Sequence, residues 1–470
     1  MSDAATAAYK GQRWLPFVIV ALVGLAWATA LAGPFQFDDH NVIVGYAPVH
    51  SLAEWWESLP GLRPLLKLSY ALNWTWSPAP YGFHLFNVLL HLLNTVLLAA
   101  WALRALPLAP RGAWLLAALW ALHPVQTEAV TYIAGRSVSL STTFLFAALL
   151  WLASPRAADS TGREAGFTGA SGRTAPWGAA LCTALALGVR ETAWIFPLLF
   201  ALVAWLRGAG ARDVLRDVGP SLAVVALAAL AFLVESHYQR MIETSFAQRE
   251  FAAQLRGQVV AHGWLLGQLV TLAPNIDPDL RLPPAWTPPL LLQALLLGAV
   301  AVLALWRVLR ARSWLAAGLL WYALCLLPTN GLMPRVDLAS ERHLYPALAG
   351  PLWSLLLLAQ ARRALAPPLS TRLAPWVAAA LVVLLAFSTL LRNEDYRSEL
   401  ALWARTAEQS PQKARVWNNL GMACRQADEP ECASVAFARA MALDPEDSRP
   451  VLNLYFLRKQ MRDAAVAEPE

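Results

Sequence analysis

The sequence predicts an all-α polytopic membrane protein whose helical bundle is followed by a small domain of helical repeats. Hydrophobic residues make up 57% of the chain and charged residues only 14%, whereas an ordinary soluble domain has about 25% charged residues. Apolar runs of about 20 residues, the length with which a helix crosses a bilayer, recur along the chain. We therefore expect a membrane domain over residues 1–391 and a soluble domain over residues 392–470.

Basic residues between the apolar runs predict eleven crossings of the membrane, with a cytoplasmic N-terminus. Lys10 and Arg13 precede the first run and stay in the cytoplasm by the positive-inside rule. Residues 34–80 and 236–289 then form outer regions, and the Ser- and Gly-rich stretch 155–176 forms a cytoplasmic loop. The expected spans cover residues 14–33, 83–103, 112–122, 137–153, 177–189, 193–206, 219–235, 290–306, 313–328, 344–361 and 374–391.

The apolar stretch 259–273 is expected to be re-entrant or interfacial, because a proline-rich segment without basic residues follows it. The final span places the C-terminal domain outside the cytoplasm. Nearly all cations of the chain are Arg, which favours a bacterial inner membrane with a periplasmic C-terminal domain.

The C-terminal segment matches the tetratricopeptide pattern, whose stacked helix pairs build a concave peptide-binding groove. The alternative is that so short an array only caps the last span or packs on the outer loops. Cys424 and Cys432 fall on the two helices of one hairpin, either as a periplasmic disulfide or as two buried thiols. The matching positions are Trp417, Leu420, Gly421, Ala433, Phe437, Ala440 and Pro445.

Two adjacent carboxylates, Asp38 and Asp39, directly follow the first expected span. A carboxylate close to lipid with a like charge beside it has a raised pKa, which suits a general base acting on a hydroxyl group. The alternative is a solvated acidic helix start. The apolar surroundings favour the catalytic interpretation.

Four arginines are expected in short outer loops, where the positive-inside rule disfavours them. A guanidinium fork at this position binds a phosphate, and a lipid phosphate of the outer leaflet is the obvious partner. Each arginine has the alternative of pairing with a neighbouring glutamate, namely Glu128, Glu191 or Glu341. The four are Arg63, Arg136, Arg190 and Arg342.

Other chemistries leave no pattern in the sequence. His84, His91 and His123 have no metal-ligand spacing and are expected to pack in the core, with His123 as the most plausible exception. No Gly-rich phosphate loop, nucleotide fold or Ser-His-Asp pattern is visible. The net charge of +6 is scattered between the apolar runs and does not form a nucleic-acid-binding face.

Taken together, these motifs resemble the transmembrane and tetratricopeptide-repeat O-mannosyltransferases over nearly the whole chain. The resemblance also extends to the order of the parts. The motifs that carry it are Phe37-Asp38-Asp39, Arg63-Pro64-Leu65, His84 to Asn94, His123 to Val130 with Gly135-Arg136, Arg190-Glu191-Thr192, and Glu341-Arg342-His343-Leu344-Tyr345.

The resemblance implies a glycosyltransferase C fold and the transfer of one hexose, such as mannose, from a polyprenyl-phosphate donor to a protein or envelope-glycan hydroxyl. By that likeness Asp38 or Asp39 deprotonates the hydroxyl with inversion at the sugar, and the four arginines hold the departing lipid phosphate. A monophosphate donor implies no metal and no further cofactor. Supporting roles fall to His123, Glu128, Glu191, Glu341, His343 and Tyr345.

Two other functions remain open at this stage. A non-catalytic membrane scaffold would recruit partners through its repeats. A transporter of lipid-linked sugars would need polar residues deep inside several spans, whereas the charged candidates of this chain collect at one face.

Overall fold

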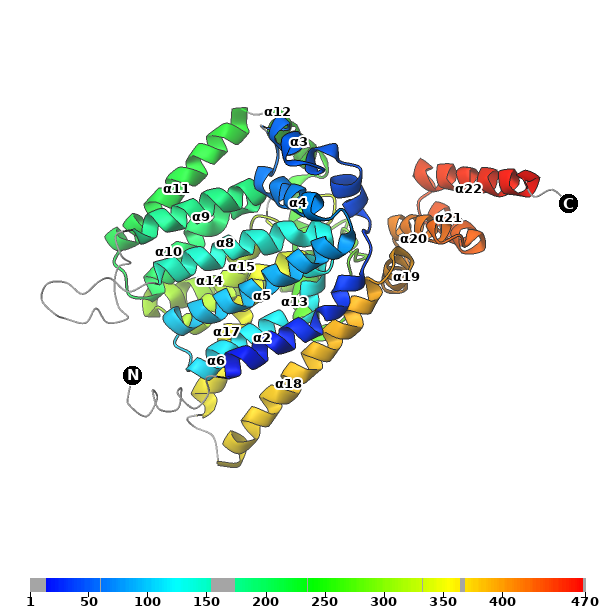
Figure 1. Cartoon of the computed structure of the whole chain (residues 1–470). Helices are drawn as coiled ribbons and strands as arrows, with labels where there is room; N and C mark the ends of the chain where they lie inside the picture. Colours follow the sequence, from blue (N-terminus) through cyan, green and yellow to red (C-terminus); the bar gives the residue numbers. More distant parts are fainter. Residues whose placement is uncertain are drawn as a thin grey trace, which may run out of the picture.

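The computed structural model describes residues 14–59, 61–153, 174–234, 236–331, 333–363 and 368–467, and every regular element within them is a helix (Figure 1). The all-α expectation is confirmed. Lys10, Arg13 and most of the expected cytoplasmic loop 155–176 lie outside the described residues.

Twelve helices of the described chain form a bundle, and most of them run in roughly the same direction in Figure 1. Proline stands in the first turn of many of them, where its missing N–H has no partner to lose. They are α2 (Leu15–Ala26), α5 (Pro80–Ala105), α6 (Pro110–Ala121), α8 (Arg136–Leu152), α9 (Ala175–Val189), α10 (Phe196–Leu206), α11 (Ala211–Val234), α13 (Phe251–Thr271), α14 (Pro288–Ala311), α15 (Trp314–Leu326), α17 (Ala349–Arg363) and α18 (Pro368–Asp395).

Every expected span coincides with one of these helices, but their lengths differ. Six helical segments of the described chain are long and apolar enough to cross a membrane, and a seventh forms if the bent pair Glu341–Ala347 and Ala349–Arg363 is one span. The predicted number of eleven is therefore not confirmed. The six are Leu15–Ala32, Pro80–Ala105, Ile133–Leu152, Ala211–Val234, Pro288–Ala311 and Arg372–Asp395.

Short elements connect the bundle helices. They supply most of the polar residues discussed below. They are η1 (Ala28–Ala32), η2 (His40–Val44), η3 (Ala47–Val49), α3 (Leu52–Glu57), α4 (Pro64–Trp76), η4 (Pro124–Gln126), α7 (Thr127–Val130), η5 (Ile133–Gly135), η6 (Glu191–Ile195), α12 (Ser236–Ala247), η7 (Glu341–His343) and α16 (Leu344–Ala347).

The core of the bundle contains closely packed aromatic and small residues. Trp101, Trp321 and Trp353 are fully buried, with ring centroids 5.2 to 5.7 Å apart. Helices α15 and α17 approach so closely that a Cβ atom on Gly350 would lie 2.3 Å from the carbonyl oxygen of Gly318. Small residues permit this backbone approach, as is usual between helices in membranes.

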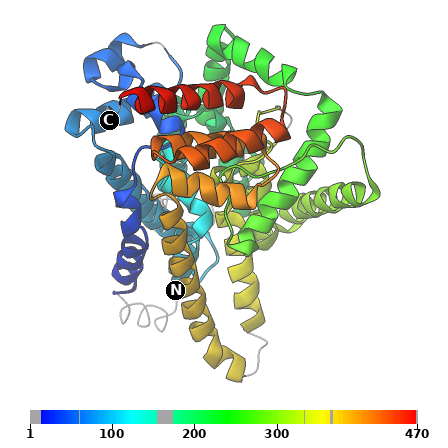
Figure 2. The same ribbon diagram turned by 90° about the vertical axis from the view of Figure 1, so that its right-hand side faces the viewer.

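The C-terminal helices α19 (Glu399–Gln409), α20 (Ala414–Gln426), α21 (Pro430–Leu443) and α22 (Ser448–Ala467) form a tail. The tail lies across one end of the bundle, as the end-on view in Figure 2 shows. Contacts such as that between Phe37 and Glu399 place the connections near residues 34–40 at this same end. We call it the tail end of the bundle.

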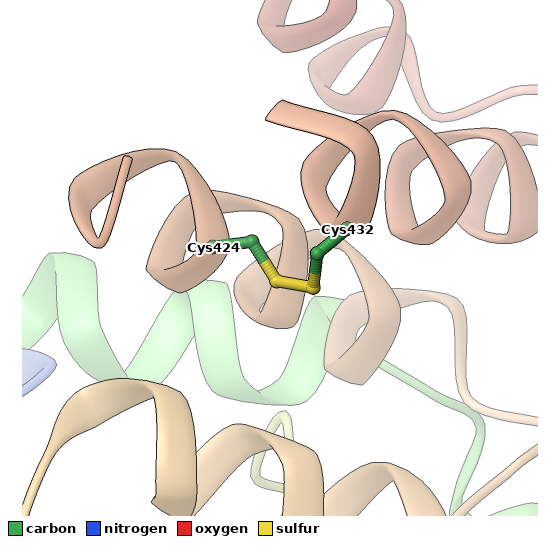
Figure 3. Close-up of a disulfide and its surroundings, with 2 residues drawn as sticks. All are labelled: Cys424 and Cys432. Atoms are coloured by element: carbon green, nitrogen blue, oxygen red, sulfur yellow. A yellow bond between two sulfur atoms is a disulfide. The ribbon is translucent and has the colours of Figure 1, made fainter. Parts of the chain in front are cut away.

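Helices α20 and α21 of the tail pack around Gly421 and Phe437. Phe437, Ala433 and Ala440 are buried, and the Phe437 ring lies 2.5 Å from where a Cβ atom of residue 421 would be; this helix packing alone does not confirm a tetratricopeptide domain. Cys424 of α20 and Cys432 of α21 form a disulfide, with their Cα atoms 5.7 Å apart (Figure 3). Of the two alternatives that the sequence left open, the structure has the disulfide.

Replacing Gly421 by alanine should destabilise the tail, because the added methyl group would lie 2.5 Å from the Phe437 ring. The expected loss is about 1–3 kcal/mol, as for other overpacked sites. Gly267→Ala is the matched control, since no atom lies within 4 Å of its added Cβ. Limited proteolysis of the tail during a thermal ramp measures the difference, and equal stability of both variants would contradict the packing.

Candidate active site at the tail end of the bundle

The segment that carries the two adjacent aspartates follows η1 and turns sharply at Phe37. Phe37 has a φ of +48°, in the left-handed region that a non-glycine residue rarely adopts. This turn directs the two carboxylates into different surroundings. The Asp38 backbone N–H donates to the Tyr132 hydroxyl at 3.0 Å, which fixes the turn against the segment between α7 and η5.

Asp39 is buried, with 1% of its surface exposed, and both of its oxygens accept hydrogen bonds from the backbone. The N–H of Gln36 donates to Oδ2 at 3.0 Å, and the N–H of Ala134 donates to Oδ1 at 2.8 Å. Burial raises the pKa of Asp39 to about 8, against the opposing effect of these two bonds. The role of Asp39 is therefore structural, because its hydrogen bond with Ala134 connects its loop to the turn at that residue.

Asp38 is only half-buried, and its side chain makes no hydrogen bond within the described part of the chain. It lies close enough to Arg342 and Tyr132 to interact with both electrostatically. The sequence left open which of the two aspartates acts as a base. The geometry favours Asp38, because its carboxylate is accessible.

The buried Glu128 and the partly exposed Arg342 form an ion pair within electrostatic reach of Asp38. Glu128 is 2% exposed and accepts from Ser340 Oγ at 2.6 Å and from the Arg342 backbone N–H at 2.9 Å. The Arg342 Nε lies 3.3 Å from Glu128 Oε1. Helix α7 and the segment before α16 are held together by this pair, so that Arg342 stands at the tail end.

Arg63 and Glu191 form a second ion pair, with bidentate geometry. The Arg63 Nε donates to Glu191 Oε1 at 2.9 Å and Nη2 donates to Oε2 at 2.9 Å. Arg63 has a φ of +52° and directly precedes Pro64, the first residue of α4. The chain therefore turns at Arg63, where α4 begins. The expected alternative of Arg–Glu pairing thus holds for Arg63 and for Arg342.

Arg190 is buried and has no carboxylate partner within the described residues. Its Nε donates to Thr192 Oγ1 at 3.1 Å and its Nη1 donates to Ser137 Oγ at 2.9 Å. The pKa of Arg190 is well below its usual value, because burial removes its solvent and because Arg63, Arg335 and Arg342 repel it. Glu191 and Glu128 pair with Arg63 and Arg342, so Arg190 and Arg335 carry the positive charge of this region that has no ion pair in the described residues.

Arg335 is a member of this arginine cluster that the sequence analysis missed. Arg335 is exposed overall, and the pKa of its guanidinium is lowered where nearby groups keep solvent from it and where Arg342 and Arg63 repel it. No ion pair of Arg335 is found in the described residues. The same positive-inside argument that selected the other arginines applies to its outer loop and would have found it.

A pocket extends from Arg190 and His343 into the bundle. One of its polar lining residues is His343, whose Nδ1 lies 3.0 Å from Asn330 Oδ1 and whose Nε2 is buried without a hydrogen bond in the described structure. Apolar lining side chains come from α8, η6, α10 and α16, and hydroxyl groups stand among them. The apolar ones are Val138, Leu145, Ile195, Phe196, Leu199 and Pro346, and the hydroxyl-bearing ones are Ser141, Thr142, Thr192 and Thr329.

Arg136 has a different role from the one expected. It is fully buried, and it donates to Asn87 Oδ1 at 2.7 Å, to the Ser69 carbonyl at 3.1 Å and to the Phe83 carbonyl at 3.1 Å. The rings of Tyr70 and Phe86 flank its guanidinium at 4.7 and 4.4 Å. All three guanidinium nitrogens are thus used inside the protein, so Arg136 joins helices and is not placed to bind a phosphate.

Three other expected residues also serve the framework. His123 accepts from the Val125 N–H at 3.2 Å and lies 3.3 Å from the Leu269 carbonyl, so it caps η4. Tyr345 is buried, with its hydroxyl 2.8 Å from His91 Nδ1 and 3.1 Å from Asn94 Nδ2. Glu341 is buried and accepts from the Asn275 N–H.

Comparison with known proteins confirms the family resemblance. The mouse protein O-mannosyl-transferase TMTC3 is 24% identical over an alignment that covers 96% of this chain and 53% of the mouse protein. Shorter matches include Xenopus laevis protein O-mannosyl-transferase tmtc2, 41% identical over 28% of this chain and 17% of the frog protein, and human TMTC4, 29% identical over 29% of this chain and 22% of the human protein.

The chain spans about half the length of the mouse relative. No family model and no solved structure matches the chain.

Replacing Arg136 by methionine should destabilise the bundle, because Asn87, Ser69 and Phe83 would each keep a buried acceptor without its donor. Each such group costs about 1–3 kcal/mol, so we expect a total loss of at least about 3 kcal/mol. Arg397→Met, at an arginine that is 74% exposed, is the control. Thermal unfolding in detergent measures both, and a stable Arg136→Met protein would contradict the structural role.

The raised pKa of Asp39 predicts how stability depends on pH. The folded carboxyl keeps its proton up to about pH 8, whereas the unfolded one loses it near 3.8, so the folded state binds more protons between these values. Stability therefore falls as the pH rises through this window. Asp39→Asn removes the titration, so its unfolding midpoint should fall less than that of the wild type between pH 5 and 8. If the unfolding midpoints of the two proteins change equally with pH, the raised pKa of Asp39 is contradicted.

Proposed function

We propose that the chain is a glycosyltransferase that moves one hexose, such as mannose, from a polyprenyl-phosphate carrier to a hydroxyl group of an acceptor protein. The relatives, which are named protein O-mannosyl-transferases, support the sugar and favour a protein acceptor over an envelope glycan. The observation that carries the proposal is the half-buried Asp38 within electrostatic reach of Arg342, whose charge also acts on Arg190 in the wall of a pocket.

The proposed donor fits this arrangement in two parts. Its phosphate would lie against Arg190 and Arg335, the two members of the arginine cluster that form no ion pair in the described structure. Its first isoprenoid units would enter the apolar pocket between α8 and α10, below Arg190. Charge-assisted bonds from guanidinium groups are among the strongest contacts a phosphate receives, so no metal is required by this scheme.

In the proposed reaction Asp38 removes the proton of the acceptor hydroxyl as its oxygen attacks the anomeric carbon. The bond from that carbon to the phosphate oxygen breaks, and its electron pair leaves with the lipid phosphate. The attack comes from the face opposite the departing phosphate, so the configuration of the sugar inverts. General-base catalysis of this kind contributes about 10²- to 10⁴-fold, and the arginines stabilise the charge that grows on the phosphate.

The finer architecture belongs to the same proposal. All eleven apolar helices that match the expected spans cross the membrane in a glycosyltransferase C arrangement, with the N-terminus in the cytoplasm. The tail end then faces the periplasm of a bacterial inner membrane, and α19 to α22 act as tetratricopeptide-type repeats. A disulfide within the tail agrees with an oxidising compartment.

The test is sugar transfer from synthetic polyprenyl-phosphate mannose to a Ser/Thr-rich peptide, measured with purified full-length protein. Asp38→Asn should lower kcat by about 10²-fold or more. Arg190→Gln should lower kcat/KM for the donor by about 10- to 100-fold, since it loses a charged hydrogen-bond donor.

The controls are Asp428→Asn, at an exposed turn with φ of +59° that asparagine tolerates, and Arg397→Gln. Undiminished transfer by Asp38→Asn would refute the assignment of the base. An unchanged donor kcat/KM in Arg190→Gln would refute the phosphate site.

A further inference from the structure

The tail contacts the bundle at the very loop that carries the two aspartates. The Gln36 side-chain amide donates to the Tyr396 carbonyl at 2.6 Å, just before α19 begins. The Phe37 backbone N–H donates to Glu399 Oε1 at 3.0 Å. Glu399 Oε2 also lies 3.6 Å from His40 Nε2. One carboxylate of α19 thus holds the loop on both sides of Asp38 and Asp39.

A contact between two aromatic rings also joins this loop to the tail. The Phe37 ring packs edge-on against the buried Trp403 ring of α19, with centroids 5.1 Å apart. Phe37 belongs to the bundle by sequence, yet it joins the hydrophobic core of the tail. Its left-handed backbone, with φ of +48°, is an unfavourable conformation that persists only where the surroundings fix it.

We propose that Glu399 is a positioning residue of the active site, which holds Phe37 in its left-handed conformation and thereby directs Asp38 toward the arginine cluster. This inference rests on the proposed function, in which Asp38 is the base. It extends that function by making the tail a part of the catalytic site. Release of the Phe37 N–H leaves the turn at residue 37 free to relax, and Asp38 moves with it.

A second contact holds the tail independently of Glu399. Lys413 and Arg415 form ion pairs with Asp277, and Arg415 Nη2 also lies 2.6 Å from Asp337 Oδ1. Ser410 Oγ donates to the Asp277 carbonyl at 2.9 Å and accepts from Asn275 Nδ2 at 2.8 Å. Because these contacts remain in a Glu399 variant, such a variant keeps the tail docked and changes only the loop.

The experiment compares Glu399→Ala and Glu399→Gln with the wild type in the full-length protein. Hydrogen exchange of a peptide covering residues 34–42 reports on the loop, and transfer from polyprenyl-phosphate mannose to the Ser/Thr-rich peptide reports on catalysis. Glu399→Ala should speed exchange of the Phe37 and Asp38 amides and lower kcat by about 10-fold or more, with the donor KM unchanged. Glu399→Gln keeps an oxygen that accepts from the Phe37 N–H, so both the exchange rate of the loop and kcat should stay close to the wild-type values.

Glu408→Ala is the matched control, because Glu408 lies on the same helix, is 67% exposed and pairs only with Arg405 in the described structure. The proposal is overturned if Glu399→Ala exchanges like this control, or if its loop exchanges faster while kcat stays unchanged. A wild-type protein without transfer activity would refute the proposed function, and the exchange result would still decide whether Glu399 holds the loop.

Discussion

The tail end of the bundle buries charged and polar side chains among apolar helices, and the cost of removing these groups from water constrains the structure there. A charged group withdrawn from water is tolerated only where hydrogen bonds and opposite charges replace the solvent. Glu128 and Arg136 meet this condition, each with two or more partners within the protein, whereas Asp39 accepts two backbone bonds and still keeps its proton up to about pH 8. These bonds join connections that are distant in the sequence, so the framework of the site is itself a network of buried polar groups.

Against this background, Arg190 stands apart. It is buried like the framework residues, yet it donates only to hydroxyl groups, and the one carboxylate that acts on it, that of Glu191, is paired with Arg63. A fold that supplies a counter-ion to Arg63 and to Arg342 but none to Arg190 leaves local positive charge unbalanced. An anionic ligand would remove that imbalance, and on this ground we propose a phosphate site at Arg190.

The sequence predicted the helices better than the roles of the polar residues. Apolar runs of the right length have few alternatives to a helix, so every expected span coincides with one. The separation of Asp38 from Asp39 was not predictable, because it depends on an N–H of Ala134, 95 residues away. Arg136 and Arg190 looked alike in the sequence, since both were expected in short outer loops. Only the positions of Asn87 and Ser69 give Arg136 its structural role.

The contact between Glu399 and Phe37 joins residues 362 positions apart and could not be inferred from either motif alone. It changes what the tail does in the proposed reaction. A tail that only captured an acceptor would act through affinity, whereas a tail that sets the geometry of Asp38 acts on the chemical step. Small displacements of a base reduce the rate steeply, because proximity and orientation supply several kcal/mol of the lowered barrier. An acceptor that contacts the tail would then affect catalysis through α19. The coupling would pass from the Glu399 carboxylate to the backbone turn at Phe37.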